Sequence, residues 1–397
     1  MSENEDISEH LKVLNNETKE SYLARISKEG IISSFNWDEF EDSLYLSTGT
    51  SGEVLKAKWK ERNKDIVLKR VASLDVTESD NQEFIKEIKA FHAIENQLNG
   101  ENKEKTLLIG HNNVIKFFGV SEQNCSCKSS KEPELYLVLE YADLNNLRDY
   151  LSHNDNSFLE WEKKIDIARQ VVCGLYFLHE IGILHRDLHT KNVVVKNDKT
   201  SKYGIRVMIT DFGLSKVLPR NSKSSQKMSG LIQFTDPEIL KEELNDKCEN
   251  LKFDRKSDVY SLGVVLWEIS SNGKPPFSAD KRANLPFLMS FDIINGKREN
   301  PIDGSKAPYV KLYTDCWNGN PELRPETKQV FELIHQESMI SGETWKHHVD
   351  EISSEDQAFY KLVETLKQQL SIEEREKVKQ LNPDKMVDLF KAALQEL

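Results

Sequence analysis

Two short stretches decide the fold: Ile183-Leu-His-Arg-Asp-Leu-His-Thr-Lys-Asn-Val-Val-Val195 and Asp211-Phe-Gly213. The first places Asp187 and Asn192 in a polar loop that runs into an apolar strand, and the second follows the apolar run 207–210. Carboxylate and amide oxygens are the hard ligands that Mg²⁺ uses when it is bound with nucleotide phosphates. Asn192 and Asp211 are therefore candidate metal ligands, and Asp187 is left to accept the proton of an attacking hydroxyl.

A glycine-rich turn and a lysine lie upstream of these stretches. In the run 46–54, Gly49 and Gly52 let backbone N–H groups approach phosphate oxygens, although a plain hairpin shows a similar run. Lys69 ends an apolar strand, where a charge needs a partner or a ligand phosphate. Glu87 follows in an amphipathic helical segment, so we expect a Lys69–Glu87 pair close to the glycine turn.

The texture of the chain changes near residue 141. Short β-rich runs, interrupted by one amphipathic helical segment, fill about 44–139, and the pattern beyond is mostly helical. This order predicts an α+β protein in two lobes. We expect a polar, partly helical N-terminal extension over 1–39, a folded domain over 40–338 divided at 141/142, and a charged helical tail over 339–397.

Taken together, these motifs resemble the eukaryotic protein kinase superfamily over about 40–338. Trp267-Glu-Ile269 and Cys316-Trp317 are similar to the tyrosine-kinase-like and tyrosine-kinase branches, and the texture, including the stretch 35–40, is similar to fungal-type members of the tyrosine-kinase-like group. The resemblance implies a bilobal fold with an antiparallel β-sheet and one main helix in the N-lobe, and a mostly helical C-lobe. It also implies ATP- and Mg²⁺-dependent transfer of the γ-phosphoryl group to a protein hydroxyl.

The resemblance assigns roles residue by residue. Lys69 would hold the α- and β-phosphates and pair with Glu87, Asp187 would be the catalytic base, and Asn192 and Asp211 would bind Mg²⁺. The nucleotide would contact a larger set: Leu46, Gly49, Gly52, Val54, Val67, Lys69, Leu139 as gatekeeper, Glu140, Ala142 and Val194.

Packing and regulatory roles follow from the same resemblance. His185 and Phe212 would stack with Phe91, and Asp258 would brace the catalytic loop. In the activation segment, Asp236-Pro-Glu238 would have Arg324 as its buried salt-bridge partner. A phosphate in this segment would meet Arg186, or else the segment is a solvated loop; its candidate serines are Ser215, Ser222, Ser224, Ser225 and Ser229.

Some positions depart from the family pattern. Ser47 replaces the first loop glycine, and Val67 replaces the usual small alanine. His189 stands where Ser/Thr kinases have lysine, and Lys191 stands where tyrosine kinases have arginine. Either cation could lie near the transferring phosphoryl group, so Lys191 joins the candidate catalytic residues. With Leu231 in place of a threonine, the phosphoacceptor stays open, and we favour Ser/Thr over Tyr.

Composition narrows the remaining alternatives. The 397 residues carry a formal net charge of -12, which argues against nucleic acid or an anionic membrane as the main partner. Five cysteines do not make a disulfide framework, and we expect a soluble, cytoplasmic protein acting on protein substrates. The alternative is a catalytically weak, kinase-like scaffold that binds nucleotide and partners. The tail is either a docking or self-association segment or a hairpin packed on the lower lobe, and 95–105 and 121–133 are loop inserts.

Overall fold

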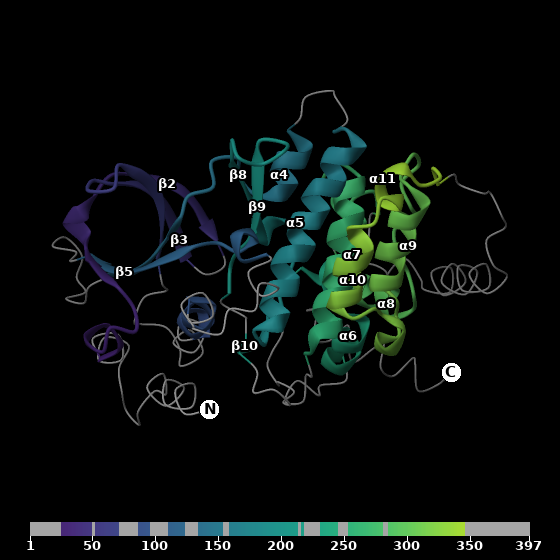
Figure 1. Ribbon diagram of the computed structural model, residues 1–397. Coiled ribbons are helices and arrows are strands. Elements are labelled where there is room, and N and C mark those ends of the chain that lie inside the picture. Colours follow the sequence, from purple (N-terminus) through teal and green to yellow (C-terminus); the bar gives the residue numbers. More distant parts are fainter. Residues whose placement is uncertain are drawn as a thin grey trace, which may run out of the picture.

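The computed structural model describes ten stretches of the chain: 25–49, 52–70, 86–95, 110–123, 134–153, 159–212, 216–217, 231–244, 253–280 and 285–345. Figure 1 shows the strands of the N-terminal half gathered in one lobe and the helices of the C-terminal half in another. The predicted α+β, two-lobed fold is therefore confirmed. The first 24 residues, the activation-segment serines, most of both inserts and the tail beyond 345 lie outside the described residues.

The N-lobe sheet has the order β1-β5-β6-β4-β3-β2. Its strands are β1 (Ser34–Asn36), β2 (Phe40–Gly49), β3 (Gly52–Trp59), β4 (Lys64–Arg70), β5 (Phe117–Gln123) and β6 (Glu134–Glu140). Five of them pair antiparallel as predicted, but β1 runs parallel to β5, so the sheet is mixed. The prediction of a purely antiparallel sheet is wrong at this edge. A three-residue strand of largely exposed residues has no apolar run that would identify it.

Residues ahead of the sheet pack into the same lobe. Ile26 is 0% exposed and Ile32 is 4% exposed, and both belong to the hydrophobic cluster that contains Phe91. Phe91 lies on the helix 86–95, which also carries Glu87. The segment that leads into β1 is therefore part of the packing that supports this helix.

A close backbone contact fixes the same segment to β5. The N–H of Val120 donates to the carbonyl oxygen of Ser33 at 2.9 Å. Gly119 has φ +148, and a Cβ there would lie 2.2 Å from the oxygen of Ser33. Glycine is required at this position because the two backbones approach too closely for any side chain.

The C-lobe is built on two long buried helices, α5 (Trp161–Glu180) and α7 (Arg255–Ser270). Every residue of α7 from 257 to 270 is buried, including the carboxylates of Asp258 and Glu268, so this helix lies inside the lobe. Around this pair lie α4 (Leu147–Ser152), α6 (Pro237–Leu244), α8 (Pro286–Ile294), α9 (Ala307–Cys316), α10 (Thr327–Ile334) and α11 (Ser338–Ser341).

Two small sheets carry the loops that matter for function. In one, β8 (Val193–Asn197) pairs with β9 (Ile205–Ile209), and in the other β7 (Ile183–Leu184) pairs with β10 (Lys216–Val217). The N–H of Ile115 donates to the oxygen of Ile209 at 2.8 Å, which joins the segment leading into β5 to β9. Asn192 directly precedes β8 and Asp211 follows β9 by two residues, so this hairpin places the two residues at the same end of the paired strands.

Candidate active site

Three charged side chains from separate elements meet between the lobes. Nζ of Lys69, on β4, lies 3.0 and 3.2 Å from the two carboxylate oxygens of Glu87 on the helix 86–95. The same Nζ lies 3.0 Å from Oδ1 of Asp211. The structure therefore brings together the predicted Lys69–Glu87 pair and adds a direct contact with Asp211.

The ammonium group of Lys69 is a buried, fixed cation. Its side chain is only 11% exposed. Burial alone would lower the pKa of Lys69, but the carboxylates of Asp211 and Glu87 outweigh burial and raise this pKa above its ordinary value of 10.5. A positive charge is thus held ready at this depth for an anionic ligand.

The catalytic-loop candidates lie in a tightly bonded turn. The side-chain amide of Asn192 donates to the backbone oxygen of Asp187 at 2.9 Å and to its Oδ2 at 3.1 Å. From below, the buried carboxylate of Asp258 on α7 accepts from the N–H of His185 at 2.8 Å and from that of Arg186 at 2.7 Å. The geometry is the predicted brace of this loop by Asp258.

Backbone strain accompanies this bonding. Arg186 has φ 71 and Asp211 has φ 67, both in the left-handed region that non-glycine residues rarely adopt. Such a conformation costs on the order of 1–3 kcal/mol and persists where the surroundings enforce it, most often at functional sites. At Arg186, part of that enforcement comes from the two hydrogen bonds that the carboxylate of Asp258 accepts from the N–H groups of His185 and Arg186.

The protonation of Asp187 is shifted strongly. Burial, together with the nearby charge of Asp211, raises the pKa of Asp187 to about 8, against the opposing hydrogen bond from Asn192. A carboxylate whose pKa is close to neutral pH is suited to general-base work.

The oxygens at this point fit a divalent cation. Because the amide nitrogen of Asn192 is bonded to Asp187, the carbonyl oxygen Oδ1 of Asn192 is left as an acceptor. With the carboxylate of Asp211 it forms a small set of hard ligands of the kind that holds Mg²⁺ together with phosphate oxygens. Within the described stretches, no cluster of three His, Cys, Asp or Glu side chains suits a metal held by protein ligands alone.

An aromatic column connects the catalytic loop to the N-lobe. The ring of Phe212 lies 5.5 Å from that of His185 and 5.3 Å from that of Phe91, as the resemblance implies. Phe91 in turn stacks on Phe117 of β5 at 4.6 Å. The sequence analysis missed Phe117, because an aromatic residue in an apolar strand carries no signal of its own there.

The predicted nucleotide residues gather on neighbouring strands. Val54 pairs with Lys69 across β3 and β4, and Val67 pairs with Leu139 across β4 and β6. Gly49 and Gly52 face each other at the end of the β2–β3 hairpin, next to Leu46, which is 42% exposed. Val67, together with Ala142 and Val194, packs on the core yet stays partly exposed, which leaves an apolar surface open to a ring.

Glu140 differs from the other members of this set. Its side chain is 5% exposed and its Oε1 lies 2.6 Å from Nζ of Lys196 and 2.9 Å from a guanidinium nitrogen of Arg206. Its own N–H donates to the backbone oxygen of Lys116 at 2.9 Å. The side chain is thus committed to a structural ion pair, and only the backbone oxygen of Glu140 is suited to contact a nucleotide.

The two residues that the sequence offered as cations beside the phosphoryl group behave differently. Burial, with His185 and Arg148 nearby, lowers the pKa of His189 to about 4. His189 is therefore neutral at physiological pH, and its expected positive charge is wrong. Lys191 is exposed on the turn η4 (Thr190–Asn192), where its charge acts on the buried carboxylate of Glu268.

The buried salt bridge of Arg324 is present, but one residue of the motif carries it alone. Both terminal nitrogens of Arg324 bind the carboxylate of Asp236, at 2.6 and 2.8 Å. Glu238, in contrast, has a 46% exposed side chain and pairs with Lys241 on the surface of α6. Asp236 stands where the family usually has alanine, so the carboxylate has moved two residues along the motif.

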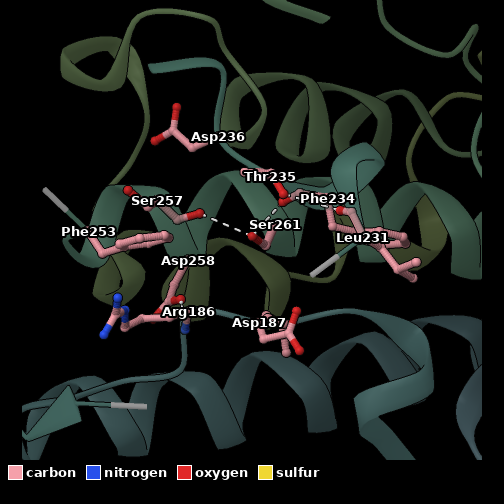
Figure 2. Close-up of a pocket in the computed structure, with 11 residues that line it drawn as sticks. Arg186, Asp187, Leu231, Phe234, Thr235, Asp236, Phe253, Ser257, Asp258 and Ser261 are labelled. Atoms are coloured by element: carbon pink, nitrogen blue, oxygen red, sulfur yellow. Dashed lines mark hydrogen bonds between the residues drawn. The ribbon is translucent and has the colours of Figure 1, made fainter. Parts of the chain in front are cut away.

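A cavity of about 20 Å³ lies behind the catalytic loop, between Asp187, the segment around Phe234 and the start of α7 (Figure 2). The hydroxyl of Ser261, one of the lining residues, donates to the backbone oxygen of Phe234 at 2.7 Å. The cavity thus lies between Asp187 and the residues of α7 that support the catalytic loop.

A family comparison agrees with this geometry. The model of the family described as "Protein tyrosine and serine/threonine kinase" matches residues 41–334. A two-lobed fold with a buried Lys–Glu pair beside a strained catalytic loop defines the protein kinases as a class. The chain belongs to the protein kinase superfamily.

Individual relatives span both hydroxyl specificities. The chain is 28% identical over 316 residues to a protein of Acanthamoeba polyphaga mimivirus whose name assigns it, provisionally, to the serine/threonine-protein kinase/receptors; 78% of this chain and 17% of that protein are covered. It is 28% identical to the tyrosine-protein kinase transforming protein Abl of Abelson murine leukemia virus, covering 76% and 35%. A third relative, the megakaryocyte-associated tyrosine-protein kinase of Rattus norvegicus, is 28% identical, covering 58% and 44%.

The chain spans about a sixth of the length of the mimivirus relatives that it matches. In the part of the chain that the structure describes, no helix combines the length and apolar character needed to cross a bilayer.

Proposed function

We propose that this chain is a protein kinase that transfers the γ-phosphoryl group of ATP to a hydroxyl of a protein substrate. The observation that carries the proposal is the contact of Lys69 with both Glu87 and Asp211. The charge of Asp211 acts in turn on Asp187, whose Oδ2 lies 3.1 Å from the side-chain nitrogen of Asn192. Folded proteins seldom bury a lysine between two carboxylates unless its charge is used.

The residues divide the work in a way that follows from their positions. The ammonium of Lys69 binds the α- and β-phosphates, and the half-buried apolar residues around Val67 and Ala142 receive the adenine ring. Asp211 and Asn192 hold Mg²⁺, which neutralises charge on the phosphate oxygens when it is bound. The carboxylate of Asp187 orients the substrate hydroxyl and takes its proton as that oxygen attacks the γ-phosphorus and the bond to the β-phosphate oxygen breaks.

We further propose Ser/Thr as the preferred acceptor, within a tyrosine-kinase-like branch of the superfamily. The sequence features similar to that branch, Trp267-Glu-Ile269 and Cys316-Trp317, support this assignment. The proposed kinase domain spans 40–338, and its buried residues form two main hydrophobic clusters, one on β2, β3, β4 and β6 and a larger one that runs from the helix 86–95 through the C-lobe. The neutral state of His189 removes the cation at the Ser/Thr-kinase position, so the proposed preference rests on the assignment to this branch.

The test is transfer of labelled phosphate from Mg-ATP to a mixed Ser/Thr/Tyr peptide array. Lys69→Met serves as the blank, and Lys64→Met, on the same strand but away from the Glu87 contact, is the matched control. Transfer that disappears only in Lys69→Met supports the enzyme, and the labelled residue type decides the acceptor. Transfer that persists in Lys69→Met would contradict it.

A nucleotide-binding scaffold is the competing function. Ser47 and Val67 at the glycine loop and adenine surface favour it, because both narrow or stiffen the nucleotide site. ATP that raises the melting temperature of the wild type without any transfer would support the scaffold and contradict the kinase.

A further inference from the structure

His189 caps the turn that carries Asn192. The residue precedes η4 with an extended backbone, and its ring nitrogen Nδ1 accepts a hydrogen bond from the N–H of Asn192 at 3.1 Å. This is the position in which a short polar side chain satisfies a backbone donor at the start of a helical turn. The same N–H also donates to the backbone oxygen of His189 at 2.8 Å, so His189 holds the backbone of Asn192 through both its main chain and its ring.

The cap determines where the proton of the imidazole lies. A ring nitrogen that accepts a hydrogen bond carries no proton, so the proton of His189 is on Nε2. Nε2 lies 3.7 Å from Oδ2 of Asp187. This separation is longer than a hydrogen bond, so the Nε2–H faces the carboxylate oxygen that Asn192 contacts at 3.1 Å and acts on it as a nearby dipole.

Packing keeps the ring in this orientation. His189 is 8% exposed, and its ring lies 5.9 Å from the ring of Phe234 in an edge-to-face arrangement. The backbone oxygen of Phe234 is in turn held by the hydroxyl of Ser261 at 2.7 Å. Phe234 belongs to η5 (Ile232–Phe234), so the ring also joins the catalytic loop to the segment that ends in Asp236.

We propose that His189 is a positioning residue for both Asp187 and Asn192, through its Nε2–H and its Nδ1 respectively. The inference rests on the proposed function for its catalytic meaning. Lysine, which Ser/Thr kinases have at this position, carries three donors and no acceptor, so it cannot form the cap. The histidine is therefore a different device at this position, and one ring orients two side chains.

Two substitutions separate the two contacts. In His189→Asn, the side-chain oxygen reaches the position of Nδ1, so the cap is kept and the donor to Asp187 is lost. In His189→Gln, the side-chain amide reaches the position of Nε2, so the donor is kept and the cap is lost. His189→Ala removes both, and His189→Lys supplies a charge without the cap.

The experiment measures kcat on a peptide and, separately, the Mg²⁺-dependent affinity for a fluorescent ATP analogue. We expect His189→Asn to lower kcat about tenfold with affinity nearly unchanged, and His189→Gln to weaken the affinity about tenfold with a smaller loss of kcat. His189→Ala should show both losses. Melting temperatures report folding, and the control is His153→Asn, at the exposed C-cap position after α4, where the ring nitrogen Nδ1 contacts the backbone oxygen of Asp149.

The outcomes are decisive in either direction. The positioning role would be overturned if His189→Ala stayed within about twofold of wild type in both kcat and nucleotide affinity. Equal losses in His189→Asn and His189→Gln would overturn it as well. A His189→Lys variant as active as wild type would do the same. If the wild type binds the Mg²⁺–nucleotide complex but transfers no phosphate, the proposed function is contradicted instead. The nucleotide affinity of His189→Gln then still tests the contact of Nδ1 with Asn192.

Discussion

In the catalytic loop, Asp187 and Asn192 are five residues apart and are joined by direct hydrogen bonds, while Lys69 and Asp211 are 142 residues apart and meet only through tertiary packing. The first pair is held from beneath by one buried carboxylate, Asp258, on the long helix α7. The second depends on a strand, a helix and a loop arriving together. One half of the candidate site lies within the C-lobe, whereas the other half is a contact between elements that are distant in the sequence.

The largest expected effect is on the half that lies within the C-lobe. Asp187→Asn should lower kcat by about 10⁴-fold, the upper end of what loss of a general base produces. Nucleotide affinity should stay within a few-fold, because the phosphate-binding cation Lys69 is untouched. Steady-state kinetics with a parallel binding titration checks both, and a variant that keeps a tenth of its activity would break the assignment.

Effects on the other half, around Lys69, should be more graded. Lys69→Met removes the cation and should lower kcat/KM by about 10²–10³-fold, whereas Glu87→Gln keeps a polar partner and should lose about tenfold. If Lys69 and Glu87 act as one unit, the double variant should lose little more than Lys69→Met alone. Additive losses in the double-mutant cycle would show that the two residues act separately.

The contribution of Asp258, which braces the catalytic loop, can be measured as a change in the free energy of unfolding. Asp258→Asn leaves one of three buried donors unmatched and removes a charge that offsets His179, so we expect a loss of about 3 kcal/mol in unfolding free energy at pH 7. Although burial opposes it, hydrogen bonding from His179 and the nearby charges hold the pKa of Asp258 below its ordinary value of 3.8.

The sign of the pH dependence follows from that lowered pKa. The ionised carboxylate of Asp258 stabilises the fold above pH 3.8, and this contribution is lost as the pH falls through the lower folded-state value. The difference between wild type and Asp258→Asn should therefore narrow below about pH 4. Denaturant melts at pH 7 and at pH 3.5 measure it, and a constant difference would contradict the account.

The smallest pair of effects compares two carboxylates of one motif. Asp236→Asn breaks the fully buried pair with Arg324 and should cost about 2–3 kcal/mol. Glu238→Gln loses only a surface pair with Lys241 and should change stability by less than about 0.5 kcal/mol. The reverse ranking would show that Glu238, as in the usual family motif, is the partner of Arg324.

The sequence predicted the parts of the site that depend on spacing. Lys69, Glu87, Asp187, Asn192 and Asp211 lie where motif order and strand boundaries place them, because β8 and β9 orient the loops that carry the last two. The two-lobed fold followed from the change of texture near residue 141.

What the sequence could not supply depends on burial. The neutral state of His189 arises from its packing against Phe234 and the nearby Arg148, which have no fixed spacing from it. The choice of Asp236 over Glu238 depends on which side chain points inward at the start of α6. The sequence did not predict β1, because three mostly exposed residues form a strand only when the edge of β5 is present.

The short strand β1 affects whether the N-lobe associates with other copies of the chain. Without residues 25–36, the outer edge of β5 would present unpaired backbone groups, among them the N–H of Val120, beside an uncovered apolar face left by Ile26 and Ile32. Exposed strand edges template association between chains. A fragment cut at the family boundary, residue 41, should form concentration-dependent aggregates, while one that begins at residue 25 should stay dispersed.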